Sequence, residues 1–231
     1  RRQSVQHRDG GVVGAIFVKE GQHVRQGQPL MELAAADVRA QARMYGAQYI
    51  ELQAQRARLI AEQLGANHVE WPAEFATLQG QEKEDAQEAI KLQTTQFNSR
   101  SSVLTAQTGV LREQASQVQE TARGYRSQLA ASSEQARLIG EELDSLQDVA
   151  EKGFVSKSRI RALERARADL QGQEGQYSVS SARSGAEAGE NRLKALEAEK
   201  AYKERAASEL RDVEFSLNEV APKYRAAKDQ L

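Results

Sequence analysis

The 231 residues are 39% hydrophobic and only 5% aromatic, with a mean hydropathy of −0.68, which is too little apolar material for a thick globular core. The abundance of Ala, Gln, Glu, Arg and Leu favours long helices or a coiled coil. The 32 basic and 33 acidic residues are mixed along the chain, so no basic field attracts nucleic acid and a protein is the expected partner. The absence of cysteine excludes disulfides and thiolate metal sites, and no apolar run of about 18 residues predicts a membrane span.

Residues 10 to 33 have the pattern of short β-strands. β-Branched and aromatic runs are separated by Glu20-Gly21 and Gln26-Gly27, where glycine supplies the positive φ of a tight turn. We predict three short strands here, within a small β domain over residues 1–36.

The glycines, the alternating apolar residues and the final Pro29-Leu30 of this stretch resemble the first half of a lipoyl or biotinyl carrier domain. In such a domain a lysine after this strand bears the cofactor, and the matching position here falls at about Asp37. No lysine occurs between Lys19 and Lys83, so the resemblance implies neither lipoate nor biotin as a cofactor. An unrelated small β-hairpin is the alternative.

From Val38 onward apolar residues recur every seven positions, which predicts an antiparallel α-helical coiled-coil hairpin over residues 37–231. The fold class is therefore mainly α, with three helices at about 37–64, 72–149 and 156–231 and a small β half-lipoyl domain at the base. Asp37 is a candidate N-cap and Gly65 a helix end. We expect the first helix to be the third helix of a bundle, or else to continue in line into the second helix.

The second and third helices have nearly equal lengths on either side of a turn at about 150–156, with Gly153 as the pivot. Trp71 and Phe75 are expected to pack over the joint between the first two helices, with partner binding as the alternative. Pro222 interrupts the third helical pattern and predicts a kink. In the second helix a seven-residue spacing, broken only by Ser132, is kept by Ile90, Phe97, Leu104, Leu111, Val118, Tyr125, Ile139 and Leu146. The complementary positions of the predicted seam hold Ala115, Ala122, Leu129, Ala136, Leu143 and Ala150.

Catalytic and metal-binding motifs are not found. His7, His23 and His68 lie in a terminus, a β turn and a loop, without ligand or acid–base partners at an informative spacing. No nucleophile elbow, zinc-protease helix or phosphate loop occurs. The sequence therefore favours a protein that is not an enzyme.

A half-lipoyl pattern leading into a long helical hairpin resembles the haemolysin-D (HlyD) family of membrane fusion proteins, and the turn at 143–159 resembles that of the protease and lipase exporter branch. The resemblance implies a periplasmic adaptor of type I secretion, anchored in the inner membrane by a segment outside this sequence. Such adaptors form rings, often hexamers, between an inner-membrane ABC transporter and a TolC-type outer-membrane channel, and a protein substrate passes through. An adaptor of a drug or small-molecule pump and a structural coiled-coil protein are the alternatives.

The resemblance also implies that the turn contacts the channel. Related adaptors carry Arg, Leu and Ser there; Ser156 matches the serine, whereas Val149 and Ser145 stand at the leucine and arginine positions. Lys152 or Lys157 is then the alternative source of positive charge. An N-cap role for Ser156 is the second interpretation. The expected docking residues are Val149, Lys152, Gly153, Phe154, Val155, Ser156 and Lys157.

Overall fold

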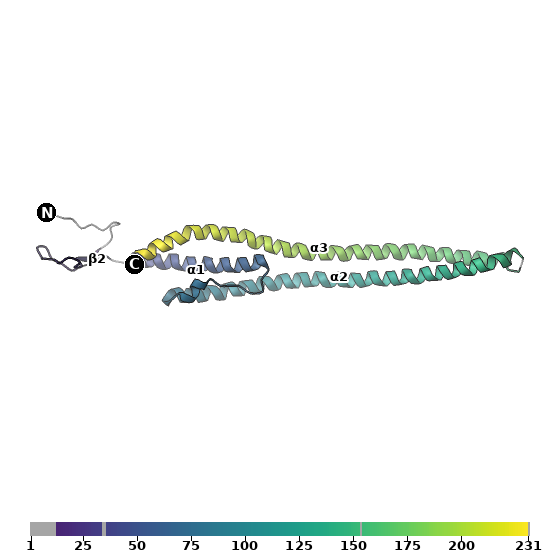
Figure 1. Ribbon diagram of the computed structural model, residues 1–231, viewed down its shortest axis with the longest axis horizontal. Coiled ribbons are helices and arrows are strands. Elements are labelled where there is room, and N and C mark those ends of the chain that lie inside the picture. Colours follow the sequence, from purple (N-terminus) through teal and green to yellow (C-terminus); the bar gives the residue numbers. More distant parts are fainter. Residues whose placement is uncertain (1–12, 34–35, 153, 231) are drawn as a thin grey trace. The chain divides into compact units, whose positions relative to one another are not determined.

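The computed structural model describes residues 13–33, 36–152 and 154–230 (Figure 1). Its contacts divide the chain into two units, the first formed by Arg1–Arg100 with Lys203–Leu231 and the second by Ser101–Tyr202. Each is described by itself below. In chain order the elements are β1 (Val13–Ile16), β2 (Met31–Leu33), α1 (Ala36–Leu64), the 3₁₀ helix η1 (Ala73–Thr77), α2 (Gly80–Glu151) and α3 (Lys157–Asp229).

Strands β1 and β2 form an antiparallel pair in which Ile16 lies opposite Met31. The sequence predicted three strands over 10–33, and the described part of that stretch contains two. The reason is that two glycine-centred turns occupy the segment between them, with Gly21 at φ 84° and Gly27 at φ 82°. Residues 10–12 of the predicted stretch lie outside the described residues.

Helix α1 ends through the backbone geometry of Gly65, as predicted. Gly65 has φ 69°, and the amide of Ala66 donates to the carbonyl of Ala61 at 2.9 Å, which is the six-to-one hydrogen bond of a Schellman cap. Asp37 lies one residue inside α1, and its side chain falls outside the described residues. Because α1 begins at Ala36, Asp37 is its second residue, and the N-cap position predicted for it is wrong.

The start of the second helix was predicted wrongly. Instead of beginning at Pro72, α2 begins at Gly80, and the intervening residues form η1 with Pro72 as its N-cap. An extended Leu78 (ψ 147°) and a positive φ of 56° at Gly80 separate the two helices. Pro72 starts a helical turn as the sequence suggested, but that turn is 3₁₀ and stops after one short element.

The first unit is a bundle of α1, the beginning of α2 and the end of α3. Phe75 is buried against Ile50 and Ala54 of α1 and Ala86 of α2, with Trp71 packed against the same cluster, so both aromatic residues cover the joint as expected. A second cluster joins α1 to α3 through Leu59, Ala206, Val213 and Leu217. Helix α1 is thus the third member of a bundle, and the in-line alternative is wrong. Within this unit α3 continues without a break past Pro222.

The second unit is a pair of antiparallel helices, the remainder of α2 and of α3. Its seam is built largely from small side chains, which let the two backbones approach closely. Two serines cross the seam: Ser132 Oγ donates to the carbonyl of Leu170 at 3.2 Å, and Ser181 Oγ donates to that of Ala122 at 3.3 Å. The buried apolar seam residues are Ala115, Ala122, Ala136, Leu143, Leu163, Ala188 and Ala195.

Candidate functional site

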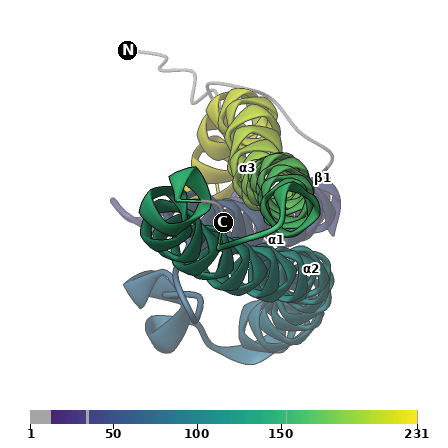
Figure 2. The same cartoon turned by 90° about the vertical axis from the view of Figure 1, so that its right-hand side faces the viewer.

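The candidate functional site is the turn between α2 and α3, the end of the second unit that faces the viewer in Figure 2. Helix α2 ends at Glu151 and α3 begins at Lys157. The amide of Phe154 donates to the carbonyl of Val149 at 3.2 Å, which ties the turn back onto the last turn of α2. Gly153, the predicted pivot, lies outside the described residues.

Ser156 occupies the N-cap position of α3 through its backbone. Its carbonyl accepts from the amides of Arg159 at 3.0 Å and Ile160 at 3.5 Å, the first hydrogen bonds of the helix. Its hydroxyl lies 3.2 Å from that of Ser158 and is exposed at the surface. The hydroxyl of Ser156 is therefore accessible to a binding partner.

The turn presents apolar surface to solvent. Phe154 is 82% exposed and Val149 is 39% exposed, whereas Val155 is half-buried. Lys152 and Lys157 are also exposed, and they precede and follow Phe154 in the sequence. A phenylalanine in water adds little to the stability of its own chain, and an aromatic side chain of this kind is what protein interfaces use as an anchor. We call the described residues of this turn, Val149, Lys152 and Phe154 to Lys157, the tip; all are exposed except the half-buried Val155.

An ion pair joins α2 and α3 next to the tip. Arg159 Nη2 of α3 donates to Glu142 Oε1 of α2 at 2.7 Å, with both side chains partly exposed. The buried Leu143 and Leu163 lie close by in sequence on the seam side of the same two helices. These contacts join the two helix ends next to the turn, while the side chains of the tip stay accessible.

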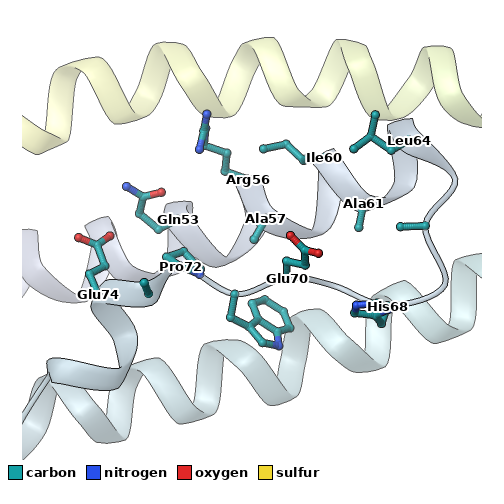
Figure 3. Close-up of a pocket in the computed structure, with 13 residues that line it drawn as sticks. Gln53, Arg56, Ala57, Ile60, Ala61, Leu64, His68, Glu70, Pro72 and Glu74 are labelled. Carbon is teal, nitrogen blue, oxygen red and sulfur yellow. The ribbon is translucent and has the colours of Figure 1, made fainter.

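A groove lies in the first unit, between α1 and the segment that leads to η1 (Figure 3). Its volume is about 600 Å³. Ala57, Ile60 and Leu64 of α1 line it together with Trp71, and polar groups including His68 stand at its edge. No group of three or more His, Asp or Glu side chains that could hold a metal ion occurs in the described ranges. The groove shows a mainly apolar wall without a pairing of catalytic groups.

Sequence reasoning missed a buried ionic cluster in the first unit. Glu62 is 1% exposed and accepts from Arg58 Nη1 at 2.6 Å and Arg100 Nη1 at 3.0 Å. Arg100 also forms two hydrogen bonds with Glu209 of α3, at 2.8 and 3.0 Å, and these lower the pKa of Glu209. The one available signal was the four-residue spacing of Arg58 and Glu62, which is ordinary on an exposed helix. The cluster joins all three helices and has a structural role.

Comparison with known proteins then places this hairpin. The family model described as AprE, long alpha-helical hairpin, matches residues 38–230. The chain belongs to the AprE hairpin family. The chain is 33% identical over 232 residues to the type I secretion system membrane fusion protein PrsE of Rhizobium meliloti (strain 1021). That alignment covers 99% of this chain and 52% of PrsE, so this AprE-family chain spans about half the length of its curated relative.

A solved structure shares the AprE-family fold. The soluble domain of LipC, a membrane fusion protein of a type I secretion system, superposes with a TM-score of 0.86 at 21% identity, and the match covers 100% of this chain and 86% of LipC. At this identity the likeness establishes the fold. None of the helices in the described ranges is both long and apolar enough to cross a membrane.

Proposed function

We propose that this protein is a periplasmic adaptor of type I secretion, and that its tip docks onto an outer-membrane channel of the TolC type. The observation that carries the proposal is the exposed tip, with an 82% exposed Phe154 between two lysines, on a hairpin of the AprE family. The relative PrsE, named as a membrane fusion protein of such a system, supports the same role.

The proposed docking residues are those predicted from the sequence. Phe154 and Val149 supply apolar contact. Ser145 stands at the arginine position of related adaptors, so Lys152 and Lys157 supply the positive charge instead. The exposed hydroxyl of Ser156 is the polar contact, and its carbonyl accepts the first hydrogen bonds of α3. Such a surface suits a partner with an apolar groove bordered by carbonyl or carboxylate oxygens.

The remaining partners follow from the adaptor role. The full-length protein would be anchored in the inner membrane beside an ABC transporter. Several copies, six being the expected number, would form a ring around the path of a secreted protein. In this role the protein has no enzymatic activity and carries no cofactor.

The β segment is proposed to be half of a lipoyl-like domain over residues 1–36, with the helical hairpin over residues 37–231. Ile16 is 67% exposed, Phe17 54% and Met31 55%. A two-stranded sheet alone does not bury such side chains and is marginally stable. A second half of the domain, supplied by sequence beyond this chain, would cover them.

The tip is tested in cells that contain the full-length protein, its transporter and its channel. We expect Lys152→Glu with Lys157→Glu, and separately Phe154→Ala, to lower secretion about tenfold or more, because interface anchors of this type contribute above about 1.4 kcal/mol each. The protein level is measured alongside, and it stays unchanged because these side chains are exposed.

The matched control reverses two lysines on the exposed surface near the start of α2, Lys83→Glu with Lys91→Glu. This variant carries the same change of net charge and is expected to secrete normally. Normal secretion by both tip variants would exclude the tip as the docking surface.

A further inference from the structure

The face of α3 that points away from α2 carries an uncharged stripe in the second unit. Gly172, Val179, Ala186 and Leu193 recur every seven residues. The last three each stand two residues before a buried seam residue, which is about 200° around the helix. A parallel column of Gly175, Ala182, Gly189 and Leu196 completes what we call the outer stripe of α3.

Seven of the eight positions of the outer stripe of α3 are exposed and Gly189 is half-buried, although the composition is that of a helix interface. Val179 is 69%, Leu193 60% and Leu196 59% exposed, and a side chain added at any of its three glycines would meet nothing within 4 Å. Its eight positions hold no charged residue in a chain that is 28% charged. A continuous heptad stripe of this kind on a long helix matches the surface that a second helix covers.

Helix α2 carries a second uncharged surface in the same unit. Its neutral column consists of Val103, Val110, Gln117, Gly124, Ala131 and Leu138, again seven residues apart and all exposed. Val103 is 65% exposed and Val110 58%. Pairing this column with the outer stripe of α3 would remove no charge from water, the condition that interface cores satisfy.

The levels of the two surfaces match. The hydrogen bond from Ser181 Oγ to the carbonyl of Ala122 places these two residues at one height along the antiparallel pair. Because the helices are antiparallel, a step back along α3 from Ser181 corresponds to an equal step forward along α2 from Ala122. Val179 is therefore level with Gly124, and by the reverse count Leu193 is level with Val110. A second copy that points the same way repeats these levels, so its α2 would meet the outer stripe of α3 antiparallel and in heptad register.

We infer that the outer stripe of α3 binds the neutral column of α2 of a second copy pointing in the same direction. Val179 then lies over the space at Gly124, where a side chain would meet nothing within 4 Å. The inference rests on the proposed function for the direction of the copies, because only copies that point the same way bring all tips to one channel. Two outer stripes could instead pair antiparallel with each other, Ala182 opposite Ala186, but their tips would then point apart.

Disulfide crosslinking tests the register, since the 231 residues contain no cysteine. Two differently tagged copies of the full-length protein, in a background without other cysteines, are produced together with the transporter and the channel. One carries Val179→Cys and the other Gly124→Cys, both at exposed positions. Copper-phenanthroline oxidation is expected to give a mixed-tag dimer.

The matched control pairs Val179→Cys with Val103→Cys, in the same column of α2 but about 30 Å further along the helix. This pair is expected to give no dimer. Equal crosslinking of both pairs, no crosslinking of either, or crosslinking of Ala182→Cys to Ala186→Cys would each overturn the inference.

A charged residue in the stripe provides a second measurement. Val179→Glu is expected to lower crosslinking between Leu193→Cys and Val110→Cys at least tenfold, because a carboxylate would be buried in an uncharged interface. A circular dichroism spectrum like that of the unsubstituted protein shows that the hairpin is folded. Crosslinking and tip-dependent secretion are separate readouts: a register-specific dimer without any effect of the tip variants contradicts the proposed function alone, and the reverse result contradicts this interface alone.

Discussion

At the scale of single residues, the ionic cluster is the most constrained part of the first unit. Arg58 is 4% exposed and Glu62 1%, and neither is a residue type that is buried without a partner. Gln93 accepts from Arg58 Nε at 2.7 Å and donates to Glu51 at 2.9 Å, so the network extends along α1 and α2. No buried side-chain nitrogen or oxygen in the described ranges lacks a hydrogen bond. The cluster therefore specifies one alignment of the three helices.

Glu62→Gln is expected to destabilise the protein by about 3 to 5 kcal/mol, because it leaves two arginines around a neutral group in a buried site. The free energy of unfolding is measured by urea titration followed by circular dichroism. Glu190→Gln is the control: Glu190 also pairs with a cation, Lys194, but on the exposed surface of α3, and its loss should leave the midpoint unchanged. Equal effects of both substitutions would show that burial of Glu62 does not matter.

At the scale of elements, the second unit depends on the small size of its seam residues. Ala122 and Ala188 are both 0% exposed, and the Ser181 hydroxyl reaches the carbonyl of Ala122 across the gap. An alanine seam buries little apolar area per residue, so its stability comes from close contact over many turns. Near the tip, Arg159 of α3 pairs with Glu142 of α2.

Ala122→Leu is expected to cost about 1 to 3 kcal/mol, because the larger side chain must force the helices apart or adopt a strained rotamer. Ala130→Leu changes the same residue type at an exposed position of α2 and is expected to have almost no effect. The urea midpoint of each variant is compared with that of the unsubstituted chain. A stabilising effect of Ala122→Leu would mean that the seam has free volume.

At the scale of the whole molecule, stability depends on acidic groups paired with cations along the chain. The pKa of Glu209 is lowered by hydrogen bonds from Arg100, that of Glu134 by Arg137 and that of Glu190 by Lys194. A carboxyl whose pKa is lower in the folded state stabilises the fold above its unfolded pKa, near 4.5, and loses this contribution as the pH falls through its folded pKa. Glu209 is partly buried and accounts for most of this contribution, whereas Glu134 and Glu190 are fully exposed and their pairs add little.

The melting temperature is expected to be nearly constant from pH 7 to about pH 5 and to fall below about pH 4.5. Thermal unfolding followed by circular dichroism at a series of pH values measures this. Glu209→Gln is expected to melt at a lower temperature at pH 7 and to show a flatter decline in acid, since the group that titrates has been removed. A melting temperature that rises between pH 5 and pH 3 would contradict the assignment.

The sequence by itself determined the helices, their heptad seams and the position of the turn, because local periodicity and glycine or proline signals depend on neighbours a few residues away. The docking role of the tip residues was implied by the resemblance to known adaptors and stays a prediction. Only the tertiary structure decided that α1 is the third helix of a bundle, that η1 precedes α2, and that Arg58 and Glu62 are buried. The buried pair of Arg58 and Glu62 is joined by Arg100 and Glu209, far along the chain, and the energy of a buried ion pair exists only once three helices exclude water around it.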